Sequence, residues 1–244
     1  MNDNEASRFD FSIAVLTAAA TCVAFAMAIF TLPRSGPFCA DDCVGYPYTD
    51  IAPYIPADFL WMYPALLPAP LFVILLNGLH ERATIDRRRF SRVALAFGAM
   101  AAAILTAIYF IQLRFVQPAV LAGEFDGLSP WTQYNPHGVF IALEEAGYML
   151  MGMAFLFAGL AVSANTGLLR AVRALFLIGF AAVAGAFVIL SVVYGFDLEY
   201  RFEVAAITVD WTVVILTGIL LAVAHRRDIG RSSAVGPQIT RTTR

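Results

Sequence analysis

Six long apolar stretches limit what this chain can fold into. Each is about 20 residues long or longer, which at 1.5 Å per residue is enough to cross the ~30 Å hydrocarbon layer of a bilayer. Backbone groups in lipid must find partners within their own segment, so each stretch predicts a helix. We therefore predict an all-α, polytopic membrane protein, a bundle of six transmembrane helices at approximately residues 11–32, 58–79, 93–113, 139–162, 171–194 and 204–224.

The composition agrees with this pattern. Of 244 residues, 60% are hydrophobic and 14% are charged, and the mean hydropathy is +0.73, which is outside the usual range for a soluble domain. Short loops leave no room for a separate soluble domain. We predict one transmembrane domain over residues 1–227 and a disordered, basic cytoplasmic tail over 228–244. The lipid bilayer is the expected partner, nucleic acid is not expected, and a homo-oligomer is left open.

The basic residues predict the orientation. All sixteen are Arg, and a six-crossing arrangement puts all but Arg34, Arg114 and Arg201 on one side. Because Arg and Lys are enriched on the cytoplasmic side, both termini are predicted to be cytoplasmic. The absence of Lys excludes a retinal or pyridoxal Schiff base and a phosphate-binding loop Lys. An Ala-rich, Arg-only usage favours a bacterial source, so we predict a multipass protein of the bacterial plasma (inner) membrane, without a cofactor.

Two cysteines lie in the first long loop, "PRSGPFCADDCVGYPYTDIAPYIPA". Cys39 and Cys43 have C-x3-C spacing and fall on the predicted outer side, where disulfides persist. We predict a disulfide between them. A metal site is not expected, because the loop has neither CxxC spacing nor a nearby His.

The helices that run inward from the outer side, the second, fourth and sixth, all open with acidic residues. In the sixth, only residues 211–224 separate Asp210 from the basic His225-Arg226-Arg227 cluster. That stretch covers ~21 Å, too little to cross the bilayer alone, so Asp210 is predicted to lie inside the membrane. Glu203 is seven residues earlier and therefore on nearly the same helix face.

Glu144 and Glu145 present two alternatives. Residues 146–164 could nearly span without them, so the pair could sit at the headgroup level or be submerged. Adjacent helix positions differ by ~100° in direction, so the two side chains cannot share one target. His137, seven residues before Glu144, is predicted on roughly the same face, and Tyr148 near both glutamates.

Five acids on this side exceed the available basic partners, taken to be Arg114 and Arg201. One interpretation is that two acids form ion pairs and the others are solvated. The other is a net acidic pocket, open to the outside, because submerged acids face a bundle interior or water, find a cation, or stay protonated. The predicted ligand-binding residues are Asp58, Tyr63, Gln112, Arg114, His137, Glu144, Glu145, Tyr148, Glu203 and Asp210.

Three function classes follow from this pocket. The first is binding or proton-coupled transport of a small cationic ligand, helped by bending at Pro64, Pro68 and Pro70. The second is a structural or accessory subunit packed through small residues such as Gly147, Gly152 and Gly159. The third is a membrane-embedded enzyme that acts on a lipid-type substrate, with His137 and the acids as a metal or acid–base site. No HExxH, clustered His or nucleophile elbow supports an enzyme, so no catalytic residue is predicted.

Three stretches also carry a resemblance: "YPYTDIAPYIPADFLWMYPALL", "TQYNPHGVFIALEEAGYMLMGMAFLFA" and "EYRFEVAAI". They resemble uncharacterised bacterial multipass membrane proteins of similar length. The resemblance covers most of the chain and implies one six-helix unit. It implies no activity and no role for any residue.

Overall fold

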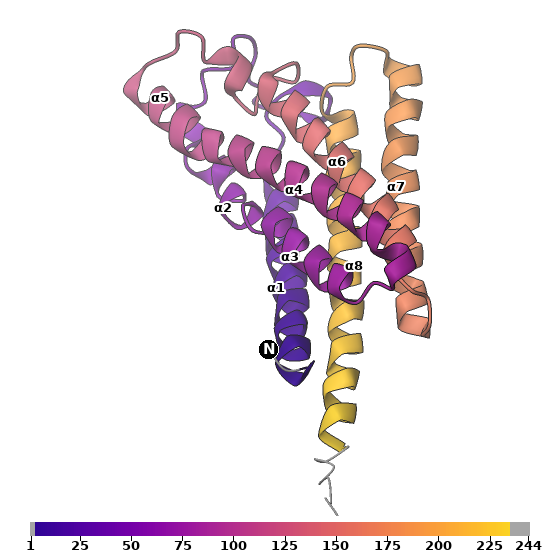
Figure 1. Ribbon diagram of the computed structural model, residues 1–244. Helices are drawn as coiled ribbons and strands as arrows, with labels where there is room; N and C mark the ends of the chain where they lie inside the picture. Colours follow the sequence, from indigo (N-terminus) through magenta and orange to yellow (C-terminus); the bar gives the residue numbers. More distant parts are fainter. Residues whose placement is uncertain (1–2, 235–244) are drawn as a thin grey trace, which may run out of the picture.

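Six membrane-spanning helical segments make up the computed structural model, which describes residues 3–234 (Figure 1). The predicted all-α, six-span architecture is confirmed. Four spans are single helices, and the second and third are composite. The helices are α1 (Asp3–Phe30), α2 (Met62–Ala65), α3 (Pro68–Glu81), α4 (Arg88–Ile111), α5 (Gln117–Ala122), α6 (Val139–Ala161), α7 (Gly167–Tyr194) and α8 (Tyr200–Ala234).

The second span is broken in two. A short 3-10 turn at Ala57–Phe59 and the single-turn α2 precede α3, and Figure 1 shows α2 offset from α3. Pro64 and Pro68 lack the N–H that an uninterrupted helix would use, and their rings clash with the preceding turn. The interruption falls between them, at Leu66 and Leu67.

The third span changes its winding near its end. A π-helical turn at Gln112–Val116 joins α4 to α5, and Gly123 ends α5 with a φ of +76°. That left-handed conformation is readily adopted by glycine and is common just after helix ends. A π turn widens the helix locally and is often found at functional positions.

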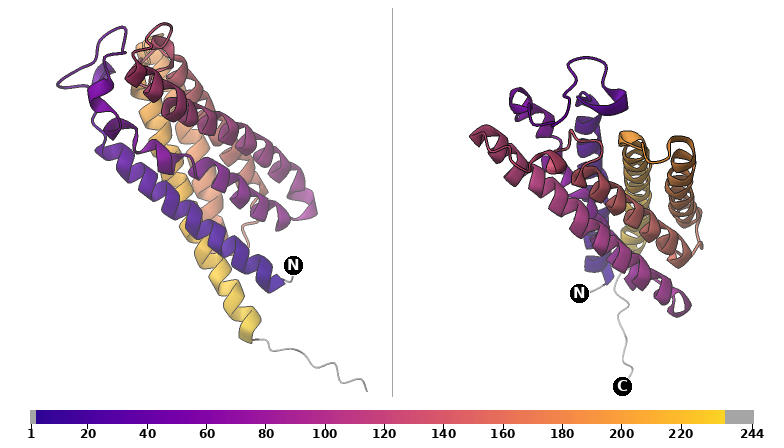
Figure 2. Two further views of the ribbon diagram at one scale, coloured as in Figure 1. Left: turned by 90° about the vertical axis from the view of Figure 1, so that its left-hand side faces the viewer. Right: turned by 90° about the horizontal axis from the view of Figure 1, so that it is seen from above.

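The long helices pack in pairs along their lengths. α4 lies along α6, α1 lies along α8, and α7 packs against both α6 and α8. In Figures 1 and 2, α4 crosses the molecule obliquely, while α7 stands beside α8 at one edge. We call the end that carries loops 31–56 and 123–138 the loop end. The opposite end, which carries the start of α1 and the end of α8, is the terminus end.

Small residues allow the close helix contacts. A Cβ on Gly218 would lie 3.0 Å from the Ala14 carbonyl oxygen, so α8 and α1 approach closely only because Gly218 has no side chain. Along α6, the three glycines contact neighbouring helices: Gly147 lies against Leu105, Gly152 against Val183 and Gly159 against Leu177. Contacts of this kind replace the hydrophobic effect as the source of helix packing in lipid.

The last helix is longer than its apolar stretch. α8 continues to Ala234, into the segment assigned from sequence to a tail starting at residue 228. The rest of that tail, residues 235–244, lies outside the described residues. Both described chain ends lie at the terminus end (Figure 2). Which end faces the cytoplasm stays a prediction from the Arg distribution.

Candidate functional site: an acidic and aromatic cluster below the loop end

A buried carboxyl group lies where α4 meets α6. The Tyr109 hydroxyl donates to Oε1 of Glu144 over 2.5 Å, and the Tyr109 and Tyr148 hydroxyls are 2.7 Å apart. All three side chains are fully buried. Because α4 packs along α6, positions 35 residues or more apart in sequence become direct hydrogen-bond partners.

Helix α8 brings two further carboxyl groups to the same place. The Glu203 carboxyl lies within hydrogen-bonding reach of Glu144. Glu203 and Asp210 both interact electrostatically with the Tyr148 hydroxyl, as their seven-residue spacing on one helix face predicts. Asp210 is 0% exposed, and neither of its carboxyl oxygens has a hydrogen-bond partner among residues 3–234. We call Tyr109, Glu144, Tyr148, Glu203 and Asp210 the carboxyl cluster.

No described ion pair neutralises the carboxyl cluster. At the loop end, Arg34 pairs with Asp58 at 3.3 Å and Arg201 pairs with Glu199 at 2.8 Å. Within the described part of the chain, neither arginine pairs with Glu144, Glu203 or Asp210. Buried carboxyl groups without a cation are tolerated only when they hold a proton or when a ligand supplies positive charge. The cluster is therefore chemically suited to bind protons or cations.

Aromatic rings surround the carboxyl cluster. Trp61 packs on Tyr109 with ring centroids 5.4 Å apart, and Trp211 packs on Tyr148 at 6.5 Å. The two tryptophans are 6.4 Å apart, and Phe25 meets Trp211 edge-on at 5.7 Å. These rings exclude water from the carboxyl groups.

A cavity of about 250 Å³ opens beside the cluster, between the last turns of α1 and the first turns of α8. Its inner wall includes Glu203, Trp61 and other aromatic side chains. Two further lining residues, Ile29 and Leu32 of the first span and its following loop, are 65% and 64% exposed. The cavity is thus mostly apolar, with Glu203 as the carboxyl group of the cluster that lines it.

Loops 31–56 and 123–138 together close the loop end, and we call them the cap. Asp58 joins them, because its Oδ2 accepts from Arg34 Nε at 3.3 Å and from the Tyr134 hydroxyl at 3.0 Å. Burial, and then the Asp58 carboxylate, raise the pKa of the Tyr134 phenol, so it stays a donor at neutral pH. The Tyr200 hydroxyl donates to the Gln133 carbonyl at 3.0 Å and lies 2.7 Å from Ser35 Oγ. Hydrogen bonds thereby connect the two cap loops, the start of the second span and the start of α8.

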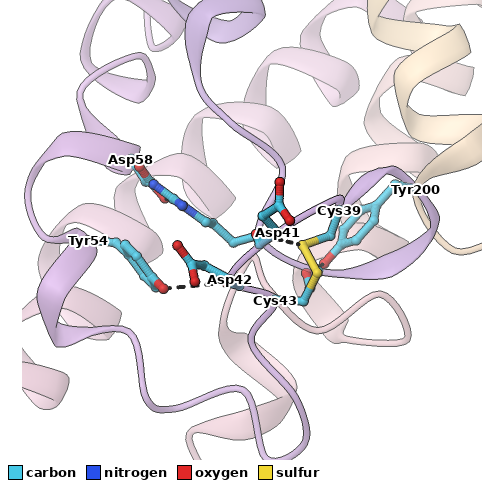
Figure 3. The surroundings of a disulfide bond; sticks show 9 residues. Cys39, Asp41, Asp42, Cys43, Tyr54, Asp58 and Tyr200 are labelled. Carbon is cyan, nitrogen blue, oxygen red and sulfur yellow. Dashed lines mark hydrogen bonds and ion pairs between the residues drawn. A yellow bond between two sulfur atoms is a disulfide. The ribbon is translucent and has the colours of Figure 1, made fainter.

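The first cap loop also contains a disulfide between Cys39 and Cys43, with Cα atoms 5.9 Å apart. Figure 3 shows the bond with Tyr54, Asp58 and Tyr200 around it. The Tyr54 ring lies beneath the Arg34 guanidinium, 4.4 Å from ring centroid to Cζ. The disulfide closes a small ring in the loop five residues after Arg34, which neutralises Asp58.

Gln112 anchors the second cap loop to the third span. Its side-chain amide donates to the Trp131 carbonyl, and its Oε1 accepts from the Gln133 N–H at 3.1 Å. The side chain is 0% exposed and lies in the π turn. Gln112 therefore positions the loop that supplies Gln133 and Tyr134, and it does not line the cavity.

The structure separates the ten predicted site residues into three groups. Glu144, Tyr148, Glu203 and Asp210 lie together in the carboxyl cluster, and Glu145 is half-buried beside it. Asp58 and Gln112 hold the cap. The remaining three have exposed side chains, and no hydrogen bond or ion pair among the described residues joins them to the cluster: Tyr63, Arg114 and His137.

The expected position of His137 was wrong for a definite reason. The seven-residue relation to Glu144 assumed one helix, but residues 135–138 form a turn and α6 begins at Val139. The His137 N–H is bonded to Asn135 Oδ1 at 3.0 Å within that turn. Its side chain consequently does not follow the helical spacing.

Most residues at the cavity are missing from the predicted set, among them Arg34, Trp61 and Tyr200. Trp61 comes three residues after Asp58 and Tyr200 three before Glu203, so proximity to the predicted acids was an available signal. The sequence predicts Arg34 on the same side as the acids but not as their partner, because a contact across 24 residues of loop leaves no sequence pattern.

No protein-family model, curated protein or solved structure matches this chain. Among residues 3–234, no group of three or more His, Cys, Asp or Glu side chains is arranged to hold a metal ion.

Proposed function

We propose that this protein binds a small organic cation with an apolar body, in the cavity below the loop end. The observation that carries the proposal is a mostly apolar cavity of about 250 Å³ with an unneutralised glutamate, Glu203, on its inner wall. Its size is slightly below the usual ~300–1,000 Å³ of small-molecule sites. The binding residues would be Glu203 for the charge and Trp61, Phe25 and Phe140 for the apolar body.

Two features favour a cation over a neutral or anionic ligand. Arg34 also lines the cavity, but Asp58 neutralises it at 3.3 Å, so Glu203 carries the uncompensated charge. Aromatic faces attract cations through their quadrupoles, most strongly where water is excluded. A desolvated carboxylate with aromatic neighbours is the combination that recognises alkylated amines.

Binding would release a proton. Two carboxyl groups within hydrogen-bonding reach, Glu203 and Glu144, are compatible with one shared proton between them. When the ligand's positive charge reaches Glu203, the shared O–H bond breaks and the proton passes to water. Glu144 then keeps its hydrogen bond from Tyr109 at 2.5 Å. The other titratable groups facing the pair are Glu145, Tyr148 and Tyr200.

Proton-coupled transport would extend this exchange. In this arrangement the rings of Phe72, Phe155 and Phe176 pack together in the core, with centroids 5.4 to 6.4 Å apart. Phe72 belongs to α3, the helix below the break in the second span. Movement of α3 about Leu66 and Leu67 would displace Phe72 and open a route inward.

The orientation that we propose puts the loop end outside the cytoplasm, in the inner membrane of a bacterium. Among residues 3–234, eleven arginines lie toward the terminus end, and three lie at the loop end: Arg34, Arg114 and Arg201. The Cys39–Cys43 disulfide favours the same orientation, because such bonds persist in oxidising compartments.

The other two classes have less support. The accessory-subunit hypothesis relied on Gly147, Gly152 and Gly159, which are occupied by contacts within the chain. The enzyme hypothesis relied on His137, which is exposed and apart from the acids.

Equilibrium binding of radiolabelled tetrapropylammonium to purified protein in detergent tests the proposal. We expect saturable binding that strengthens from pH 6 to pH 8, with proton release measured by an indicator dye. Glu203→Gln should weaken binding at least tenfold, because it removes the carboxylate that faces the cavity. The control Glu124→Gln, which changes an exposed carboxylate on α5's flanking loop, should bind as the wild type does. Equal affinity of wild type and Glu203→Gln would refute the proposal.

A further inference from the structure

A second cavity, of about 520 Å³, lies at the terminus end. The ends of α3, α6 and α8 and the start of α7 enclose it, and it shares no lining residue with the cavity at the loop end. Leucines from three helices form its apolar wall. Polar and charged residues also line it: Arg82, Ser163, Thr166, His225, Arg227 and Asp228.

The start of α7 gives this cavity unpaired donors. Thr166 Oγ1 accepts from the Leu169 N–H at 3.2 Å, but the N–H groups of Gly167 and Leu168 have no partner among the described residues. Both residues line the cavity. The N-terminus of a long helix, here 28 residues, attracts anions through these N–H groups and the helix dipole.

A buried histidine adds a second, independent indication of a ligand. His225 is only 7% exposed, and its Nδ1 has no hydrogen-bond partner among residues 3–234. Ser163 lines the same cavity, and its Oγ is likewise buried without a partner among the described residues. Buried polar groups are rarely left unpaired, so two such side chains at one cavity favour a polar ligand group there.

The arginines differ in the charge that they offer. Arg82 is bonded to Asp10 at 2.9 Å and to Asp228 at 3.4 Å, so its charge is largely compensated. Arg227 is exposed and forms no ion pair within the described part of the chain. The positive charge at the cavity that is held in no ion pair among the described residues therefore comes from Arg227, together with the α7 N-terminus.

We propose that this cavity binds the headgroup phosphate of an anionic phospholipid, with an acyl chain along its apolar wall. Leu79, Leu169 and Leu221 line that wall, and the polar groups lie at the ends of the spans, where headgroups are found. A free phosphate ion would use the polar part and leave the apolar wall uncovered. The shape of the cavity consequently favours a lipid. This inference is independent of the proposed function of the loop end.

Neighbouring arginines provide a matched test. Arg226 and Arg227 are both exposed, but only Arg227 lines the cavity. Lipid binding to delipidated protein would be measured by native mass spectrometry with phosphatidylglycerol and with phosphatidylcholine. We expect phosphatidylglycerol to bind at least fivefold tighter to wild type, and Arg227→Gln to remove that preference while Arg226→Gln keeps it.

Two outcomes would overturn the inference. If Arg226→Gln and Arg227→Gln reduce the preference for phosphatidylglycerol equally, the protein surface attracts anionic lipid in general and the cavity is not the binding site. Full displacement of phosphatidylglycerol by 10 mM inorganic phosphate, about a hundredfold above the lipid, would indicate a free-anion site instead. Gel filtration and circular dichroism of each variant would show that the fold is kept, so a lost preference can be assigned to the cavity.

Discussion

Acidic residues have opposite surroundings at the two ends of the molecule. At the terminus end, Asp10 and Asp228 lie near the surface and share Arg82 as a partner. Below the loop end, Glu144 and Asp210 are fully buried without an arginine among the described residues. Carboxyl groups that share a surface arginine stabilise local structure. Those kept from both water and arginine retain their capacity to bind a proton or a ligand.

An aromatic layer separates the two ends. Phe72 from α3, Phe155 from α6 and Phe176 from α7 are each 0% exposed and contact one another. Between α3, α6 and α7, the side chains at this level are therefore apolar and closely packed. The contrast between the ends is drawn across this layer.

Removing a ring from the aromatic layer should have the largest effect. Phe155→Ala leaves a cavity in a fully packed region and is expected to reduce stability by about 3–5 kcal/mol. Phe157→Ala is the matched control, because Phe157 stacks on Phe97 outside this layer and is half-buried, and it should cost less. Unfolding in detergent followed by circular dichroism would measure both. Equal losses of stability in the two variants would show that the aromatic layer contributes no more to stability than the pair of Phe97 and Phe157.

Removing the hydroxyl that supports Glu144 should have an intermediate effect. Tyr109→Phe leaves Glu144 Oε1 without its donor and should cost about 1.5–3 kcal/mol, because the lost hydrogen bond is buried. Tyr63→Phe removes the hydroxyl of a tyrosine that is 54% exposed and should change stability little. Unfolding in detergent followed by circular dichroism would measure both variants. Equal stabilities of Tyr109→Phe and Tyr63→Phe would contradict the structural role of the Tyr109 hydroxyl.

Breaking the ion pairs at the terminus end should have the smallest effect. Arg82→Gln removes contacts to Asp10 and Asp228, but the Arg82 side chain is 37% exposed and such pairs contribute about 0–1 kcal/mol. Repeating the measurement in 0.5 M salt should reduce the difference from wild type further. A loss above about 2 kcal/mol would show that this end is held by charge, which would remove the contrast with the loop end.

Features set by length and spacing could be predicted from the sequence. The six spans follow from apolar stretches that match the bilayer thickness. The burial of Asp210 follows from the ~21 Å between it and the basic cluster after Ala224. The shared face of Glu203 and Asp210 follows from helical geometry, because both lie in one unbroken helix, α8.

Features set by loops could not be predicted in this way. Arg34 neutralises Asp58 only because the cap folds back over the second span, and Tyr134 completes that contact from another loop 76 residues away. Arg114 was assigned a role because it is basic and on the same predicted side as the acids, but its side chain is exposed on the surface. Helical spacing fixes direction within a helix and gives no information across a turn.

The amide of Gln112 has a consequence for how a ligand would arrive. Through Trp131 and Gln133, this side chain fastens the second cap loop to the third span, and Asp58 fastens the same loop to the second span. Hydrogen bonds thus join the cap to these two spans. On the remaining side, Ile29 and Val204 are exposed at the cavity's margin, on helices long and apolar enough to span a membrane. Entry would then be sideways from the membrane, and partitioning into the lipid leaflet would select ligands before the protein does.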